Sequence, residues 1–250
     1  MAYCPTQVDS MLQKEMQITQ HTVFKPSFGE KGTRSDADNA AHANGLKTGT
    51  TTLGIICKDC VVMAADKRAT AGTMIVDKKV EKVRPVTKHI AITTAGSVSD
   101  IQLLYKYLGA ELKIKHLRAG KEATIKEASN LLSGWVYGLL RSSYGIAHFL
   151  VGGYDTKPQL FDVYPDGSVT DVDDYVTSGS GSVFALGVLE SQYKKNMTAE
   201  EGVLLALKAI NTALARDSAS GNGIDVYVID KNGYRKAASK VVGTSADNNQ

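Results

Sequence analysis

The sequence predicts an α+β fold in which antiparallel sheets carry pairs of helices packed outside them. The expected elements follow the order strands, two helices, strands, two helices, strands. Helices therefore arrive in pairs, whereas a doubly wound parallel sheet alternates single helices with single strands. The apolar run 61–65 is also short, as expected for a strand that is buried on both faces.

Length and composition are those of a soluble globular protein. The 250 residues suffice for one large domain or two small ones, and no interdomain linker is visible after residue 50. Hydrophobic residues make up 43% of the chain, and no apolar run is long enough for a transmembrane helix. Residues 1–20 lack the continuous apolar core of a signal peptide, so we expect a cytoplasmic protein. The net charge of +3 is too small and too evenly spread to indicate nucleic-acid binding.

The three cysteines are too few, and odd in number, for a disulfide framework, so a reducing compartment is expected. Cys57 and Cys60 form a CxxC pattern. A zinc site needs about four ligands, however, and no second CxxC or paired histidine follows. We therefore expect structural cysteines beside a turn, and no metal.

The first third of the chain predicts a polar leader followed by strands. Residues 1–46 are polar, and scattered apolar positions within 10–24 predict at most one short element. The composition changes abruptly at Thr48. Two strands follow at 50–57 and 60–66, then a turn at 70–73 and further strands at 75–83 and 90–94.

Two helices and a second group of strands come next. Apolar residues between Ile101 and Leu112 fall on one helical face. The second helix begins at Thr124, because Glu127 completes a Thr-x-x-Glu capping box. Strands are then expected at 147–151 and 159–163, followed by a Pro-Asp-Gly turn at 165–167.

The last third of the chain predicts a second helix pair and a hairpin. A loop of small residues, 178–182, leads into a helix through about Tyr193, and a second capping box starts at Thr198. The loop lacks the lysine and the spacing of a P-loop, which argues against a nucleotide site. Strands at 224–229 and 234–237 are joined through an Asn-Gly turn.

The stretch 47–56 joins the leader to the first strand and contains the Gly49–Thr50 junction. Threonines at a strand start are usually explained by β-propensity. The alternative is that the chain is cut between these two residues and that Thr50 becomes a nucleophile. Taken singly, the other polar candidates are explained by solvated charge or by turns. These candidates are Asp66, Arg68, Lys82 and Asp217.

Taken together, these residues resemble the β subunits of the 20S proteasome, most closely the archaeal type. The resemblance covers residues 48–238. The matching segments are TGTTTLG (48–54), ADKRAT (65–70), KVEK (79–82), TAG (94–96), LVGGYD (150–155), SGSGS (178–182), GVLES (187–191) and RDSASG (216–221). Because the segments occur in the family's order, the match is highly specific.

This resemblance implies an N-terminal-nucleophile hydrolase fold, a four-layer α-β-β-α sandwich of two antiparallel sheets between helix pairs. That fold agrees with the element order found above. The resemblance further implies that residues 1–49 are a propeptide, removed by self-cleavage at Gly49–Thr50, and that residues 50–250 are the peptidase domain. This leader is longer than the short archaeal prosegments.

The resemblance also implies a role for each matching residue. Thr50 is the nucleophile and the new N-terminus, beside a charge pair of Asp66 and Lys82. Ser180, Asp217 and Ser220 form the group around the amine. The Gly96 backbone N–H is the oxyanion donor, and Arg68 holds the strand end. The implied substrate pocket is lined by Ala69, Thr70, Val80, Arg84, Thr94 and Val98.

The chemistry of these residue types is consistent with such roles. A threonine hydroxyl is a weak nucleophile until a base removes its proton. An α-amine titrates near ~8 and can act as that base, whereas the same nitrogen inside a chain is an amide. A buried Lys82 ammonium would lower the hydroxyl's pKa and would need Asp66 as its counter-charge. A glycine N–H such as that of Gly96 can approach an oxyanion closely.

The residues of the implied pocket leave two kinds of substrate side chain open. Small apolar walls favour an apolar side chain, whereas Arg84 would favour an acidic one if it points inward. Thr70 and the region of Gly96 would pair with the substrate backbone as an added strand.

We expect a threonine endopeptidase in stacked rings with α subunits and other β subunits. It would degrade unfolded polypeptides delivered by ATP-dependent unfoldase caps, without a metal or organic cofactor. One alternative is a catalytically silent ring subunit, which should have lost Thr50, Lys82 or Asp66. Another is a different N-terminal-nucleophile hydrolase, such as the bacterial two-ring protease or a small amidase, against which the segments 178–182 and 216–221 argue.

Overall fold

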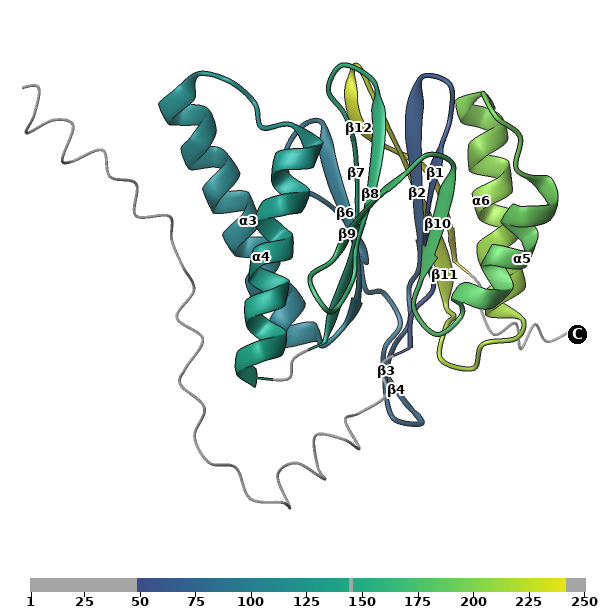
Figure 1. Ribbon diagram of the computed structural model, residues 1–250. Helices are drawn as coiled ribbons and strands as arrows, with labels where there is room; N and C mark the ends of the chain where they lie inside the picture. The colour runs from purple at the N-terminus through teal and green to yellow at the C-terminus, as the bar shows by residue number, and fades with distance from the viewer. Residues whose placement is uncertain (1–48, 144–145, 242–250) are drawn as a thin grey trace, which may run out of the picture.

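Two antiparallel five-stranded sheets face each other, and each carries one pair of helices on its outer side (Figure 1). The computed structural model describes residues 49–143 and 146–241. This layering confirms the predicted α-β-β-α sandwich. The short element expected within 10–24 lies outside the described residues. No helix in the described ranges is both long enough and apolar enough to cross a membrane.

The first sheet has the strand order β10-β1-β2-β11-β12. These strands span Tyr175–Ser178, Thr52–Ile56, Cys60–Asp66, Gly223–Asp230 and Gly233–Val241. Every residue of the central strand β2 is buried, which explains its continuous apolar run. Helices α5 (Ser182–Gln192) and α6 (Ala199–Leu214) cover this sheet. The second helix begins at the predicted capping box of Thr198 and Glu201.

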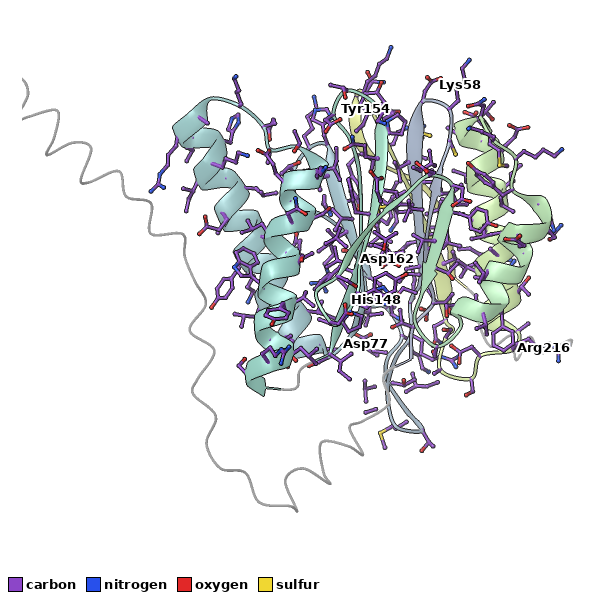
Figure 2. All side chains as sticks on the ribbon, viewed as in Figure 1. Lys58, Asp77, His148, Tyr154, Asp162 and Arg216 are labelled. Carbon is purple, nitrogen blue, oxygen red and sulfur yellow. The ribbon has the colours of Figure 1, made fainter. Side chains whose placement is uncertain are left out.

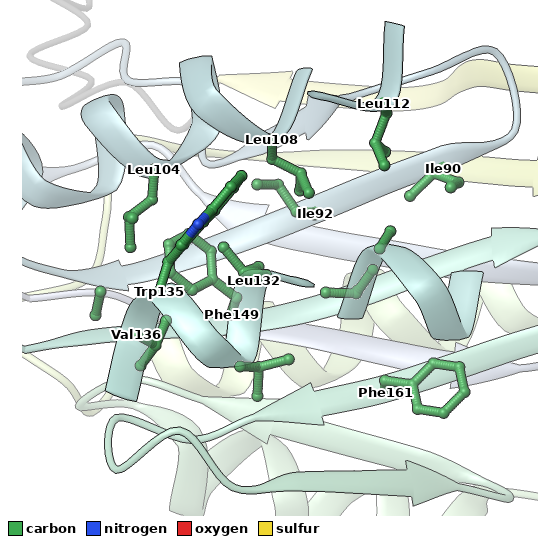
Figure 3. Close-up of a cluster of buried hydrophobic side chains, with 14 of the residues drawn as sticks. Ile90, Ile92, Leu104, Leu108, Leu112, Leu132, Trp135, Val136, Phe149 and Phe161 are labelled. Carbon is green, nitrogen blue, oxygen red and sulfur yellow. The ribbon is translucent and has the colours of Figure 1, made fainter. Parts of the chain in front are cut away.

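The second sheet has the strand order β5-β6-β7-β8-β9. These strands span Val83–Pro85, Ile90–Gly96, Ala147–Tyr154, Pro158–Val163 and Val169–Val172. Helices α3 (Val98–Ala119) and α4 (Ile125–Ser143) pack on it through the cluster drawn in Figure 3. The predicted box at Thr124 and Glu127 precedes α4, with hydrogen bonds of 2.9 and 3.2 Å.

A third apolar layer lies between the sheets and sets their separation. Met63 and Leu150 belong to it, and both are fully buried. A Cβ atom on Gly152 would lie 2.7 Å from the Met63 sulfur, so this glycine permits the close approach of the sheets. The Thr93 hydroxyl also donates a hydrogen bond of 3.1 Å to the Thr52 hydroxyl across this layer.

The predicted strand at 75–83 is wrong in its second half. Strand β4 (Met74–Asp77) ends early and pairs with β3 (Ala69–Ala71), which occupies part of the predicted turn. The hairpin of β3 and β4 projects from the body of the molecule (Figure 1). Residues 78–82 then cross toward β2, with the Val80 amide donating to the Lys67 carbonyl at 3.1 Å. The short strands β9 and β10 were not predicted from the sequence.

Leu132→Ala should lower the free energy of unfolding by about 2–5 kcal/mol, because this fully buried side chain of α4 would leave a cavity. The matched control is Leu117→Ala on α3, where the side chain is 72% exposed and the change should stay within about 0.5 kcal/mol. Equilibrium denaturation of the purified chain measures both values. Equal effects of the two variants would contradict this placement of the core.

Candidate active site

The candidate residues meet where several strands end. Thr50 precedes β1, Asp66 is the last residue of β2, Lys82 directly precedes β5, and Gly96 is the last residue of β6. The side chains of the first three are buried, and the exposed fractions of these residues are 6%, 1% and 5%. Solvated charge therefore does not explain Asp66 or Lys82.

Asp66 and Lys82 form a buried ion pair with 2.7 Å between Oδ1 and Nζ. The aspartate Oδ1 also accepts a hydrogen bond from the Thr51 amide at 2.9 Å. Its Oδ2 accepts from the amides of Arg68 and Gly221, both at 3.0 Å. Burial lowers the pKa of the Lys82 ammonium below its usual value, and the Asp66 carboxylate opposes that effect. The surrounding amides thus hold a carboxylate in place as the counter-charge for the lysine.

The Gly49–Thr50 peptide bond lies directly against this ion pair. Lys82 Nζ donates to the Gly49 carbonyl oxygen at 3.1 Å, and Thr50 Oγ1 donates to the same oxygen at 2.6 Å. The Gly49 amide donates to the Thr70 hydroxyl at 2.7 Å. A Cβ atom on Gly49 would lie 2.0 Å from the Ala219 Cβ, so only glycine fits here. The arrangement places a hydroxyl beside a carbonyl whose oxygen accepts a hydrogen bond from an ammonium.

A second hydrogen-bonded group of side chains reaches the Thr50 nitrogen through Ser180. This nitrogen donates to Ser180 Oγ at 3.2 Å. Asp217 Oδ2 accepts from the hydroxyls of Ser180 and Ser220 at 2.7 and 2.6 Å. The structure thus joins Ser180, Asp217 and Ser220 in one hydrogen-bonded group that reaches Thr50 through Ser180, although they come from two loops that lie far apart in the sequence.

Arg68 joins the end of β2 to the loop that carries Asp217. Its Nε donates to Asn222 Oδ1 at 2.8 Å, and its Nη1 donates to the Ser218 carbonyl at 2.8 Å. Two residues of this cluster were not predicted: Asn222, and Thr51, whose hydroxyl lies 2.7 Å from Ser220 Oγ. Asn222 directly follows the segment 216–221 and Thr51 lies within the segment 48–54, and this placement is the only signal that pointed to them.

Gly96 faces the cavity in front of Thr50. Its φ of +121° is one that L side chains rarely adopt, and an added Cβ would lie 2.2 Å from the Ile146 carbonyl oxygen. Glycine is therefore required at this strand end, where it lines the same cavity as Thr50.

All of the predicted pocket residues line this cavity. They are Ala69, Thr70, Val80, Arg84, Thr94 and Val98. Val76, Ile101 and Gln102, which were not predicted, also line it.

The charge of Arg84 is engaged by neighbouring groups. Its Nε donates to the Glu81 carbonyl at 3.0 Å, and its guanidinium carbon lies 5.5 Å from the centre of the Tyr105 ring. Its aliphatic stem can therefore line the cavity while the charged end stays on Tyr105. In the part of the chain that the structure covers, no group of three or more His, Cys, Asp or Glu residues could hold a metal ion.

The sequence matches the family model described as "Proteasome subunit" over residues 46–229. Proteasome subunit beta 2 of Pyrococcus abyssi is 43% identical over 191 residues, which cover 76% of this chain and 91% of that protein. Proteasome subunit beta 1 of Thermococcus sibiricus is 43% identical over 194 residues, covering 78% and 93%. The β subunit of Methanococcus aeolicus is 41% identical over 201 residues, covering 80% and 92%.

Asp66→Asn should lower the free energy of unfolding by about 3–5 kcal/mol near neutral pH, because it leaves a buried ammonium without its counter-charge. The pKa of Lys82 in the folded variant would fall further below 10.5, its usual value. The unfolded chain then binds more protons between these two pKa values, so the stability of the variant rises with pH through that window.

Denaturant titrations of both proteins at neutral pH and near pH 10 test this, with Asp173→Asn on an exposed loop as the control. The stability difference between variant and wild type should shrink at the higher pH. A difference independent of pH would contradict the role assigned to the Asp66 charge.

Proposed function

Because the chain belongs to the proteasome subunit family, we propose that it is a catalytic β subunit and a threonine-type endopeptidase. It cleaves its own leader between Gly49 and Thr50 and then hydrolyses unfolded polypeptides. One observation carries the proposal: the Thr50 hydroxyl and the Lys82 ammonium both contact the carbonyl oxygen of Gly49. A silent ring subunit has no need for a buried ion pair at this bond.

Self-cleavage starts when Thr50 Oγ1 attacks the Gly49 carbonyl carbon. A C–O bond forms, the C–N bond breaks, and the hydroxyl proton passes to the leaving nitrogen, which becomes an α-amine. Lys82 stabilises the negative charge that develops on the carbonyl oxygen, 3.1 Å away in the uncleaved chain. Water then hydrolyses the ester and releases the leader. The products are a leader of residues 1–49 and a peptidase domain of residues 50–250.

Peptide hydrolysis repeats this chemistry on a separate substrate. The freed amine has a pKa near ~8 and takes the Thr50 hydroxyl proton, directly or through a water molecule. Ser180 contacts that nitrogen, and Asp217 orients the serine. The hydroxyl attacks the substrate carbonyl, and the backbone N–H of Gly96 stabilises the oxyanion. The substrate C–N bond then breaks as the α-amine passes the proton to the leaving nitrogen, and water hydrolyses the acyl ester on Thr50.

The cavity favours an apolar side chain before the bond that is cut. Val80 and Val98 line it, and the charge of Arg84 is held by Glu81 and Tyr105. A buried acidic side chain would need a new hydrogen bond to that guanidinium, whose Nε already donates to the Glu81 carbonyl. We further propose that the chain works in the cytoplasm, in stacked rings with α subunits and other β subunits, and with ATP-dependent unfoldase caps.

Thr50→Ala, co-expressed with the α subunits, should abolish both leader removal and peptide hydrolysis, because the attacking oxygen is lost. Intact-mass and N-terminal sequencing of the assembled particle report processing, and a fluorogenic peptide reports hydrolysis. Thr212→Ala removes a half-buried hydroxyl on α6 that donates only within its own helix, to the Lys208 carbonyl, and should behave as wild type. Active wild-type particles that start at a residue other than Thr50, or hydrolysis retained in Thr50→Ala, would refute the proposal.

A further inference from the structure

A serine, a histidine and an aspartate form a hydrogen-bonded chain between the two sheets, outside the catalytic set described above. His148 Nε2 lies 2.6 Å from Asp162 Oδ1, and His148 Nδ1 lies 2.8 Å from Ser178 Oγ. His148 comes from β7, Asp162 from β8, and Ser178 is the last residue of β10. Figure 2 shows His148 and Asp162 in the middle of the molecule, between the sheets.

The three residue types are those of a serine-hydrolase triad, but their placement excludes a second nucleophile. Ser178 is 2% exposed and is paired within the first sheet with Thr52. No substrate carbonyl can reach a hydroxyl in that position. The resemblance is therefore one of hydrogen-bonding order, in which the carboxylate orients the imidazole and the imidazole holds the hydroxyl.

The hydrogen-bonded chain of Ser178, His148 and Asp162 links two strand ends that both reach the Thr50 site. On one side, β7 pairs with β6 so that His148 lies opposite Ala95, directly before the Gly96 that lines the cavity. On the other side, Ser178 leads into the loop whose Ser180 contacts the Thr50 nitrogen. One imidazole thus spans from the strand pair that presents the oxyanion donor to the loop beside the amine.

The surroundings of His148 hold the ring in one orientation. Asp162 is 2% exposed, and its Oδ1 lies 2.6 Å from Nε2 of the ring. The other ring nitrogen, Nδ1, lies 2.8 Å from the Ser178 hydroxyl. The Tyr164 ring stacks on the imidazole with 5.3 Å between centroids and 24° between planes. Two hydrogen bonds and a stacking face leave the ring little freedom.

Directional bonds matter here because most of the contact between the sheets is apolar. Burial of apolar surface resists separation of the sheets, but it is non-directional and does not by itself fix their relative position. The hydrogen bonds of His148 to Ser178 and of Thr93 to Thr52 cross that layer with defined geometry. The first of these is the one attached to the Ser180 loop.

We propose that His148, oriented by Asp162, is a positioning residue that fixes the spacing between the Gly96 N–H and the Thr50 amine by anchoring Ser178. This inference rests on the proposed function. A reacting group displaced by about 1 Å costs on the order of a hundredfold in rate. Loss of the anchor therefore lowers kcat. KM changes little, because His148, Asp162 and Ser178 are not among the residues that line the cavity.

His148→Ala and Ser178→Ala, each in the assembled particle, test the inference with an apolar fluorogenic peptide. Each variant should lower kcat about 10- to 100-fold while KM stays within about twofold. The double variant should lose no more than the larger single loss, because both changes break one chain. His148→Gln should recover most of kcat, because its amide both donates and accepts. His116→Ala, on the exposed part of α3, is the matched control and should be unchanged.

The outcomes separate the two proposals. Wild-type particles without hydrolysis would refute the proposed function. Active wild-type particles with an unchanged kcat in His148→Ala or Ser178→Ala would overturn the inference alone. Equal losses in His148→Ala and His148→Gln, or a rise in KM matching the fall in kcat, would also overturn it. If His148→Ala fails to assemble, Ser178→Ala and His148→Gln decide the matter by the same criteria.

Discussion

The buried ion pair between Lys82 and Asp66 is the interaction on which the rest of the site depends. Placing two charges in a protein interior is unfavourable unless each is fully paired. Asp66 meets that requirement with four hydrogen bonds, two on each oxygen. Three of these come from backbone amides, so the charge pair and the local chain path require each other. The departure of residues 78–82 from strand geometry follows from bringing Lys82 to this carboxylate.

Most of the fold could be predicted because local and tertiary signals agree. The capping boxes at Thr124 and Thr198 mark helix starts, and the apolar run of β2 marks a strand buried on both faces. Strands β9 and β10 escaped prediction because each has four residues and largely polar or half-buried faces. Their partners β8 and β1 define them as strands, and pairing with a distant segment leaves no periodicity to detect.

Part of the candidate site could likewise be predicted from the sequence, and part could not. Thr50, Asp66 and Lys82 were singled out through a family resemblance, and the structure brings them together. Thr51 joins this cluster through a contact with Ser220, which lies far away in the sequence. The direction of the Arg84 side chain depends on its contact with Tyr105 in helix α3. His148 carried no sequence signal, because its two hydrogen-bond partners are 14 and 30 residues away. Only the packing of the sheets reveals such residues.

Gly49 lies in the same cavity wall as the residues that would select later substrates. In the uncleaved chain its carbonyl is delivered to Thr50 by covalent connection, so no binding energy is needed to hold it there. Glycine also presents no side chain for the cavity to recognise. Under the proposed mechanism, self-cleavage is thus independent of side-chain selectivity, and changes in the walls around Val80 and Val98 would leave the proposed cut at Gly49–Thr50 unaffected.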